Sequence, residues 1–273
     1  MNMKNSTKNG NYANINGLSI YYEIHGTGQP LVLLPGALSG IGSAFGRLIP
    51  LLARTRQVIA VELQGYGHTA DIADRPLSYK HYAEDTAALL EHLRMNQADI
   101  LGYSSGAGAA LQVAIRYPRL VRKLVLCSVT YTSSGIYPEM RAGIEELTPE
   151  ILAGSPYEQE YLQTAPRPQD WPQLIAKAKA FNKQIQEWPA SDLKEMKSPV
   201  LLIAGDSDLV CPEHIAEMFR LLGGGHPGDL MGLPASQMAI LPGTTHMGLT
   251  ERTDLFMAII PPFLDAPMPE QKV

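Results

Sequence analysis

The stretch Ala98-Asp-Ile-Leu-Gly-Tyr-Ser-Ser-Gly-Ala-Gly-Ala-Ala110 decides the fold of this chain. Residues 98–101 form a short apolar run typical of a buried strand, and residues 106–116 carry apolar side chains at helical spacing. Between them, residues 102–106 read Gly-Tyr-Ser-Ser-Gly, which matches the pattern G-x-S-x-G between a strand and a helix. Small residues on both sides permit a sharp, strained turn. We therefore expect Ser104 to project clear of the sheet.

The same turn resembles a second motif, the glycine pattern with which short-chain dehydrogenases bind nucleotides. That family carries its glycines after the first strand and a Tyr-x-x-x-Lys pair downstream. Here the turn lies about a hundred residues into the chain, and none of the 12 tyrosines has a lysine four positions later. We therefore interpret the turn as the site of a nucleophile, with the Ser105 side chain directed elsewhere.

Composition limits the class of protein. The 273 residues suit one sizeable domain, 45% of them are hydrophobic and 18% charged, and the net charge of -5 argues against a nucleic-acid partner. Residues 1–12 are polar without an apolar core, so we expect a frayed tail rather than a signal peptide. No apolar run approaches a membrane span, and Cys127 and Cys211 are expected to be free thiols. A cytoplasmic monomer or homodimer acting on a small molecule is the expectation.

Strand and helix patterns alternate along most of the chain. Apolar or alternating runs predict strands at residues 18–25, 30–35, 57–61, 98–101, 121–129, 199–204 and 237–241. Helical patterns fall at residues 78–95, 106–116, 213–222 and 254–264. This alternation predicts an α/β protein with a doubly wound, mainly parallel sheet. Ligands of such sheets gather at the carboxyl ends of the strands, where Ser104 is expected.

The pattern changes between residues 131 and 197. This segment has no strand-like run, contains a helical stretch at residues 174–186, and is interrupted by several prolines. It also carries both tryptophans of the protein. We predict two units, a core made of residues 1–130 and 198–273 and an inserted helical segment of residues 131–197.

Two further turns carry an acid and a histidine. Residues 205–212 read Gly-Asp-Ser-Asp-Leu-Val-Cys-Pro after one expected strand, and His246 follows the last strand. The chain order Ser104, Asp208, His246 resembles that of the α/β-hydrolase superfamily, in its serine esterase and lipase-like branch with a helical cap. The resemblance assigns the acid to Asp208. Asp206 stays open as the alternative, with bracing of the turn as its more ordinary role.

The resemblance also implies an oxyanion hole made of the backbone N–H groups of Ala37 and Ser105. This chain has Pro35-Gly36 where the family commonly has a His-Gly pair, but a backbone donor requires no particular side chain. A family turn of the form Asp-x-x-Gly-x-Gly-x-Ser is matched by residues 62–69, with Glu62 and Thr69 as replacements. His68 in this turn precedes the nucleophile, which is the wrong order for the base.

Similarity to this branch implies hydrolysis of a carboxylic ester or lactone through an acyl-enzyme intermediate, without a metal or cofactor. The aromatic cap suggests a fairly bulky, apolar substrate, with macrolide-type macrolactones among the possibilities. Substrate contacts are expected from a set of large side chains near the turns and in the cap: Tyr103, Tyr131, Tyr137, Trp188 and Met247.

Other activities remain open because one fold and one triad serve several reactions. A cofactor-free perhydrolase or haloperoxidase and a carbon-carbon bond hydrolase would use the same residues. A protein of another class, a non-catalytic ligand-binding member of the superfamily, would keep the fold without turnover.

Overall fold

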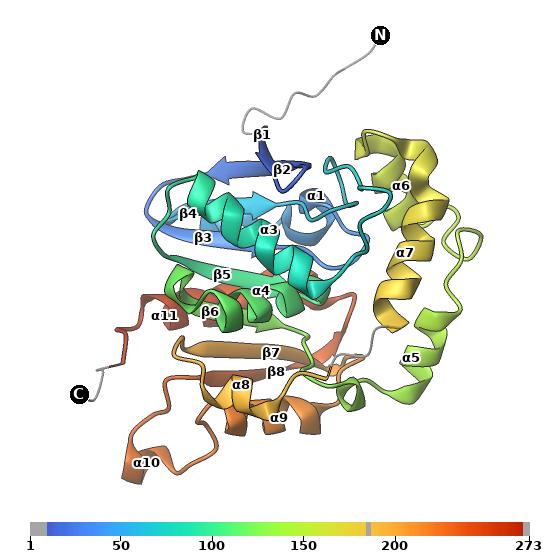
Figure 1. Cartoon of the computed structure of the whole chain (residues 1–273). Coiled ribbons are helices and arrows are strands. Elements are labelled where there is room, and N and C mark those ends of the chain that lie inside the picture. Colours follow the sequence, from blue (N-terminus) through green and yellow to red (C-terminus); the bar gives the residue numbers. More distant parts are fainter. Residues whose placement is uncertain (1–9, 184–186, 270–273) are drawn as a thin grey trace.

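A single sheet forms the frame of the protein. The computed structural model describes residues 10–183 and 187–269, and within them eight strands pair in the order β1-β2-β4-β3-β5-β6-β7-β8 (Figure 1). β1 pairs antiparallel with β2, β2 pairs antiparallel with β4, and every other pair is parallel. The prediction of a doubly wound, mainly parallel sheet is confirmed. The strands are β1 (Gly10–Ile15), β2 (Leu18–His25), β3 (Gln29–Leu34), β4 (Arg56–Val61), β5 (Ala98–Tyr103), β6 (Val121–Cys127), β7 (Val200–Ser207) and β8 (Gln237–Thr245).

Residue choice explains where the strands lie in the sheet. β3, β5 and β6 are nearly continuous apolar runs with buried side chains, which suits strands that are covered on both faces. The edge hairpin of β1 and β2 turns at Asn16 and Gly17, which have φ angles of 50° and 82°. Two successive positive φ values are what a tight hairpin turn requires, and an Asn-Gly pair adopts them at low cost.

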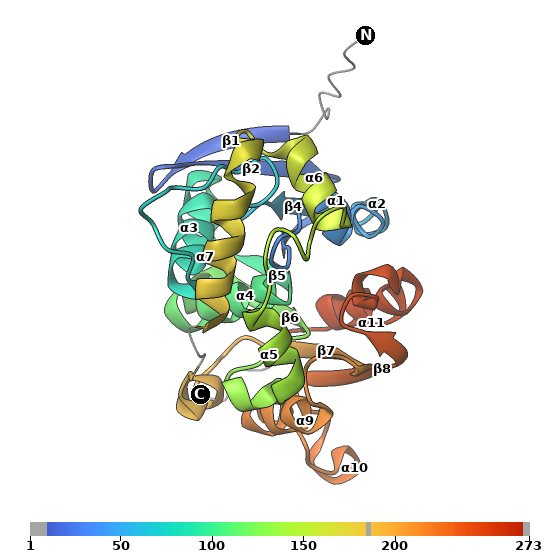
Figure 2. The same cartoon turned by 90° about the vertical axis from the view of Figure 1, so that its right-hand side faces the viewer.

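Two layers of helices cover the sheet (Figures 1 and 2). α3 (Tyr79–His92), α4 (Ser105–Arg116), α8 (Ala190–Lys194) and α9 (Pro212–Leu221) contribute to the apolar cluster on one face. α1 (Ile41–Phe45), α2 (Ile49–Leu52) and α11 (Thr253–Asp265) contribute to the cluster on the other face. α10 (Gly228–Met231), which the sequence does not predict, lies in the connection between α9 and β8.

The helical segment, residues 131–197, holds α5 (Pro138–Glu145), α6 (Pro156–Thr164) and α7 (Trp171–Lys183) in addition to α8. Figure 1 shows α5, α6 and α7 beyond one end of the sheet, whereas α8 lies beside α9. α7 begins three residues before the predicted helix, and residues 184–186 of that prediction lie outside the described residues. α8 therefore packs in the helical layer on the sheet, beside α9, and not with α5, α6 and α7.

A cluster of hydrogen bonds ties the helical segment to the loop after β4. The Lys177 ammonium on α7 donates to the Asp71 carboxylate at 2.6 Å and to the Ile72 carbonyl at 2.6 Å. The Arg167 guanidinium donates to the backbone carbonyl of Asp71 at 2.6 Å. Because both cations are partly shielded and meet fixed acceptors, they hold α7 against the body of the protein.

Several predicted boundaries shift by a few residues. α3 starts at Tyr79 because the Ser78 hydroxyl accepts the His81 backbone N–H as an N-cap. β8 continues through Pro242 to Thr245, beyond the predicted end at residue 241. Among the described residues, no helix combines the length and apolar character needed to cross a membrane.

The contact between α4 and the end of β3 requires glycine at position 106. A Cβ on Gly106 would lie against the carbonyl oxygens of Leu34 and Pro35, well inside van der Waals distance. We expect Gly106→Ala to destabilise the protein by about 3 kcal/mol, because the obstacle is backbone. The matched control is Gly143→Ala on α5, where a Cβ meets no atom within 4 Å and helix propensity favours alanine by about 0.5–1 kcal/mol. Urea denaturation of both variants checks this; equal stability of the two would contradict the close approach.

Candidate active site

The turn after β5 places Ser104 at the head of α4. Ser104 has φ 54° and ψ -120°, a conformation that side-chain-bearing residues rarely adopt. Its carbonyl accepts the N–H groups of Ala107 and Gly108, and its own N–H donates to the Cys127 carbonyl on β6 at 2.8 Å. Ser105 is buried in the first turn of α4. The two neighbouring serines are therefore separated in role, with Ser104 facing the carboxyl ends of the strands.

Three of the predicted residues meet there. His246 Nε2 lies 3.1 Å from Ser104 Oγ, and His246 Nδ1 lies 2.9 Å from Asp208 Oδ1. A carboxylate can only accept, so the imidazole carries its proton on Nδ1 and presents an unprotonated Nε2 to the serine hydroxyl. Such an arrangement is able to remove the proton from Ser104.

The Asp208 side chain is fully buried and is surrounded by donors. Oδ1 accepts from the Leu209 N–H at 2.7 Å and from the Ser128 hydroxyl at 2.8 Å, and Oδ2 accepts the Gly205 N–H at 3.2 Å. Burial by itself raises the pKa of Asp208, but the hydrogen bond and charge of His246 and these further donors outweigh it, so the pKa lies below its ordinary value. Asp208 is therefore an anion at neutral pH.

The alternative acid, Asp206, lies at the exposed end of β7, just before the turn that carries Asp208. Its carboxylate accepts the backbone N–H groups of Gly243 at 2.8 Å and Thr244 at 3.1 Å. These two bonds lower the pKa of Asp206 and connect the end of β7 to the end of β8. Asp206 thus braces the turn that leads to His246.

The two expected oxyanion residues lie on different segments, since Ala37 follows β3 and Ser105 is the first residue of α4. β3 is next to β5 in the sheet, and Ala37 and Ser105 line the same cavity as Ser104. Two carboxylates hold the chain just after Ala37. Glu160 on α6 accepts the Gly40 N–H at 2.9 Å and the Ser43 N–H at 3.0 Å, and Glu62 accepts the Ile41 N–H at 3.2 Å.

His68, the other histidine considered from sequence, belongs to that arrangement. Its Nδ1 lies 3.1 Å from Glu62, and its ring stacks on Tyr21 with centroids 4.2 Å apart. The hydrogen bond with Glu62 raises the pKa of His68 against the opposing effect of burial. Its contacts therefore fix Glu62 and the turn after β4.

The cavity in front of Ser104 has a volume of about 80 Å³. Its walls are apolar or uncharged, and no lysine, arginine, aspartate or glutamate lines it among the described residues. The lining residues are Ala37, Tyr79, Ser104, Ser105, Ser128, Val129, Thr130, Ile136, Ile144, Asn182, Leu209 and Val210. The helical segment contributes Ile136, Ile144 and Asn182 to this wall.

The five large side chains expected to contact substrate are not among these lining residues. Tyr103 stacks on His246 with centroids 5.1 Å apart and donates its hydroxyl to the His246 carbonyl at 2.9 Å. Tyr131 stacks on His214, and Trp188 meets Tyr79 edge to face. Tyr103 and Tyr131 are buried and Trp188 is half-buried, so all three pack against other side chains.

The remaining two are exposed at the surface. Tyr137 directly precedes α5, and Met247 follows His246 with its sulfur 2.8 Å from the Tyr157 hydroxyl. Sequence reasoning favoured large aromatic side chains, while the cavity wall consists mainly of smaller ones such as Thr130 and Val210. Ser128 lines the cavity and was not expected from sequence. Its place directly after β6, like that of Ser104 directly after β5, is the sequence signal that could have identified it.

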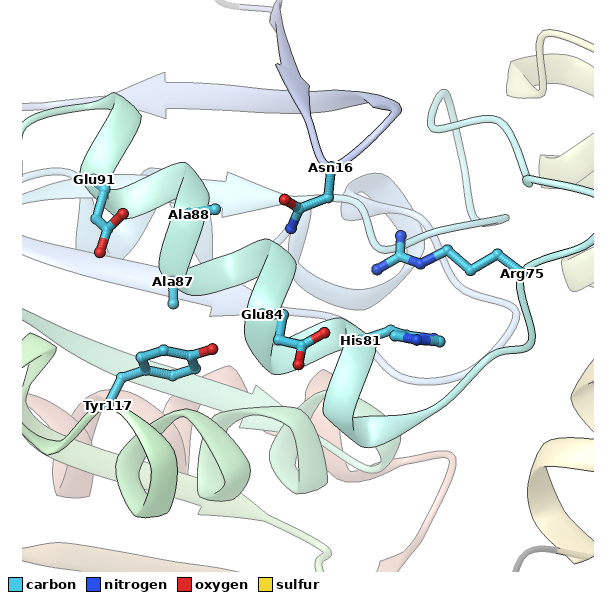
Figure 3. Close-up of a pocket in the computed structure, with 8 residues that line it drawn as sticks. All are labelled: Asn16, Arg75, His81, Glu84, Ala87, Ala88, Glu91 and Tyr117. Atoms are coloured by element: carbon cyan, nitrogen blue, oxygen red, sulfur yellow. The ribbon is translucent and has the colours of Figure 1, made fainter.

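A larger hollow of about 470 Å³ lies along the outer side of α3 (Figure 3). Asn16, Arg75, His81, Glu84, Ala87, Ala88, Glu91 and Tyr117 line it. None of them lines the cavity at Ser104, and the Arg75 guanidinium is already paired with Asp85 at 2.8 Å. The described residues also contain no group of three or more His, Cys, Asp or Glu side chains that could hold a metal ion.

Comparison with known proteins agrees with this architecture. The profile of the alpha/beta hydrolase family matches residues 31–259, and the chain belongs to that family. The chain is 27% identical to an uncharacterized hydrolase, YugF, of Bacillus subtilis, over 92% of this chain and 96% of the relative. It is 39% identical to a 2-hydroxymuconate semialdehyde hydrolase of a Pseudomonas species over 37% of this chain and 36% of the relative.

A solved structure extends the likeness over the fold. The crystal structure of E-2-(acetamidomethylene)succinate hydrolase superposes with a TM-score of 0.73 at 21% identity, covering 94% of this chain and 99% of the other. This structural likeness shows the fold, and the family match together with the similar hydrolases identifies the protein as a hydrolase. The low identity leaves the substrate to be argued from the site itself.

The two aspartates of the turn after β7 provide a direct test of the site. We expect Asp208→Asn to lower kcat on the order of 10⁴-fold, because an amide no longer fixes the Nδ1 proton or stabilises an imidazolium. Asp206→Asn, which keeps an acceptor for the turn, should stay within about threefold of wild type. Steady-state kinetics of the two variants on one substrate measures this, and a larger loss for Asp206→Asn would move the acid to that residue.

Proposed function

We propose that this protein is a serine hydrolase of carboxylic esters or lactones that works through an acyl-enzyme. One observation carries the proposal: the ring of His246 lies within hydrogen-bond distance of Ser104 on one side and of a buried carboxylate on the other. A serine hydroxyl is a weak nucleophile at neutral pH, and this contact supplies the base that it needs.

In the acylation step, Ser104 Oγ attacks the ester carbonyl carbon and its proton passes to His246 Nε2. The carbonyl oxygen becomes an oxyanion, which the N–H groups of Ala37 and Ser105 stabilise, each by roughly 3 kcal/mol. Asp208 stabilises the imidazolium without taking its proton. Collapse of the tetrahedral intermediate breaks the bond to the alkoxide, which leaves with the proton from His246.

In the deacylation step, a water molecule takes the place of the alcohol. His246 Nε2 accepts a proton from that water as its oxygen attacks the acyl carbon, and the second tetrahedral intermediate collapses to release the acid. Ser104 recovers its proton from His246. The same side chains therefore serve both half-reactions, and in each one His246 acts first as the base and then as the acid.

Substrate size follows from the cavity. At about 80 Å³ it is well below the roughly 300–1,000 Å³ of most ligand sites, so in this arrangement it accommodates a short acyl group and not a bulky one. The bulky or macrocyclic substrate expected from the aromatic content would require α5 and α7 to move outward. We propose that the helical segment acts as a cap and that short acyl groups are preferred.

Substrate charge follows from the uncharged wall. The names of two similar proteins, the semialdehyde and the succinate hydrolases, denote substrates that carry carboxylates. A carboxylate placed in this cavity would lose water and meet no cation, which is costly. We therefore propose a neutral acyl group, and this places carbon-carbon bond hydrolysis of acidic substrates second as a candidate activity.

The activity itself is tested with p-nitrophenyl esters of increasing acyl length and with simple and macrocyclic lactones. We expect turnover of the acetate to butyrate esters by the wild type and a loss on the order of 10⁶-fold in kcat for Ser104→Ala. Ser19→Ala, an exposed serine on β2, is the control and should match the wild type. If the wild type hydrolyses no member of the panel, the proposal of ester hydrolysis is refuted.

The charge preference is tested by comparing p-nitrophenyl valerate with mono-p-nitrophenyl succinate, which have similar acyl lengths. We expect kcat/KM to be at least about tenfold higher for the neutral ester, because an unpaired buried charge costs more than 1.4 kcal/mol. Measurement at low and high salt checks that bulk repulsion does not cause the difference. Equal kcat/KM values would mean that an acidic substrate is accommodated.

A further inference from the structure

We propose that Ser128 is a positioning residue of this site, which orients the His246 ring and the Asp208 carboxylate through its hydroxyl. The inference rests on the proposed function and adds a fourth side chain to the three that sequence order suggested. It concerns a residue that acts through its neighbours and does not itself touch the reacting atoms.

The sheet order puts Ser128 in the right place for this role. β6 lies between β5, which leads to Ser104, and β7, which leads to Asp208. Ser128 is the first residue after β6, and its N–H donates to the Ile203 carbonyl on β7 at 2.7 Å. This bond fixes the backbone of Ser128 against the strand that carries the acid.

The side chain closes a triangle of hydrogen-bonding atoms. Ser128 Oγ lies 2.8 Å from Asp208 Oδ1 and 2.7 Å from His246 Nδ1, while these two atoms are 2.9 Å apart. The hydroxyl proton goes to the carboxylate, which only accepts, and a lone pair of Oγ faces the Nδ1–H group. The imidazole N–H is therefore held from two directions.

Two hydrogen-bond acceptors at Nδ1 restrict the orientation of the His246 ring more than one acceptor does. With Asp208 alone, the ring is free to swing about the Nδ1 to Oδ1 direction, and Nε2 moves away from Ser104. The contact with Ser128 opposes that motion, so that Nε2 stays 3.1 Å from Ser104 Oγ. Misplacement of a catalytic group by a fraction of an ångström is enough to slow a reaction strongly.

The backbone of Ser128 indicates that its side chain, and not its backbone, is what the site uses. Ser128 has φ 55°, the left-handed region in which glycine is the favoured residue. Glycine at this position would keep the backbone bond to the Ile203 carbonyl and relieve strain, but would remove the hydroxyl. This separates the stability effect of a substitution from its effect on catalysis.

The test compares Ser128→Gly and Ser128→Ala with the wild type in kcat, KM and urea denaturation. We expect kcat to fall about 10-fold to 100-fold in both variants, the value of a hydrogen bond to a charged group, with KM within about threefold. We also expect the glycine variant to be more stable than the alanine variant, because both lose the hydroxyl bond to Asp208 and only glycine relieves the backbone strain. A merely structural role would instead make kcat follow stability, so that the glycine variant is clearly more active than the alanine variant.

Arg94→Gly is the matched control. Arg94 follows α3, is exposed, and also has a positive φ of 55°. Relief of strain there should raise stability without changing kcat. If Ser128→Gly behaves like Arg94→Gly, with wild-type kcat and increased stability, the proposal is overturned.

A second readout separates this inference from the proposed function. A fluorophosphonate reports an activated serine without requiring ester turnover: Ser104 Oγ bonds to phosphorus, fluoride leaves, and the proton passes to His246. We expect labelling of the wild type at Ser104 and slower labelling of both Ser128 variants by the same 10-fold to 100-fold.

Each outcome decides one claim. Labelling without hydrolysis of any ester would refute the proposed function, while the labelling rates of the Ser128 variants would still decide the positioning role. Unchanged labelling rates in those variants would overturn the inference alone. Absence of labelling in the wild type would overturn both, because no activated serine would be present to position.

Discussion

The buried negative charge of Asp208 is the constraint on which the arrangement of the site depends. A carboxylate that is closed off from water must be compensated by donors with good geometry, since an unpaired charge in a protein interior is costly. Here the donors are a histidine ring, a hydroxyl and two backbone N–H groups. They come from the ends of β6, β7 and β8, so the charge is stable only when these strands pair in register.

The same sheet order connects the acid to the nucleophile. Ala37, Ser104, Ser128, Asp208 and His246 follow β3, β5, β6, β7 and β8, which are successive neighbours in the sheet. Because these strands are parallel, all five residues lie at the same end of the sheet, beyond the carboxyl ends of the strands. The strained backbone of Ser104 is maintained by bonds to β6 and to the first turn of α4. The packing of α4 thus maintains the strained backbone conformation in which the Ser104 hydroxyl faces His246.

The helical segment forms part of the cavity wall and is also bound to the loops that follow β3 and β4. Lys177 and Arg167 hold it to the loop at Asp71, and Glu160 holds it to the chain after Ala37. Helix α6 therefore contacts the same loop that carries an expected oxyanion donor. Any movement that enlarges the cavity for a bulky substrate would act on that loop as well. A bulky substrate would therefore disturb the expected oxyanion donor, which is a second physical reason to propose short acyl groups.

The sequence by itself determined the features that depend on local pattern and chain order. Continuous apolar runs predict buried parallel strands, and the glycines around Ser104 predict its turn. The resemblance of the chain order to that of the α/β-hydrolases then implies Asp208 and His246. These signals are local, and the parallel topology then brings strand ends to one edge. The Asn16-Gly17 pair is a local signal of the same kind, because its residues favour the tight turn that joins β1 and β2.

Only the tertiary structure decided which side chains face the cavity and which pack elsewhere. Trp188 and Tyr131 are aromatic residues at plausible places in the chain, yet their rings pack on Tyr79 and His214. Asn182 and Thr130 line the cavity without any distinctive pattern in sequence. The contact of Ser128 with both members of the acid-histidine pair likewise joins residues 80 and 118 positions apart. Local periodicity states which face of an element is apolar, but the direction of a side chain in a loop is set by packing between segments that only the folded chain brings together.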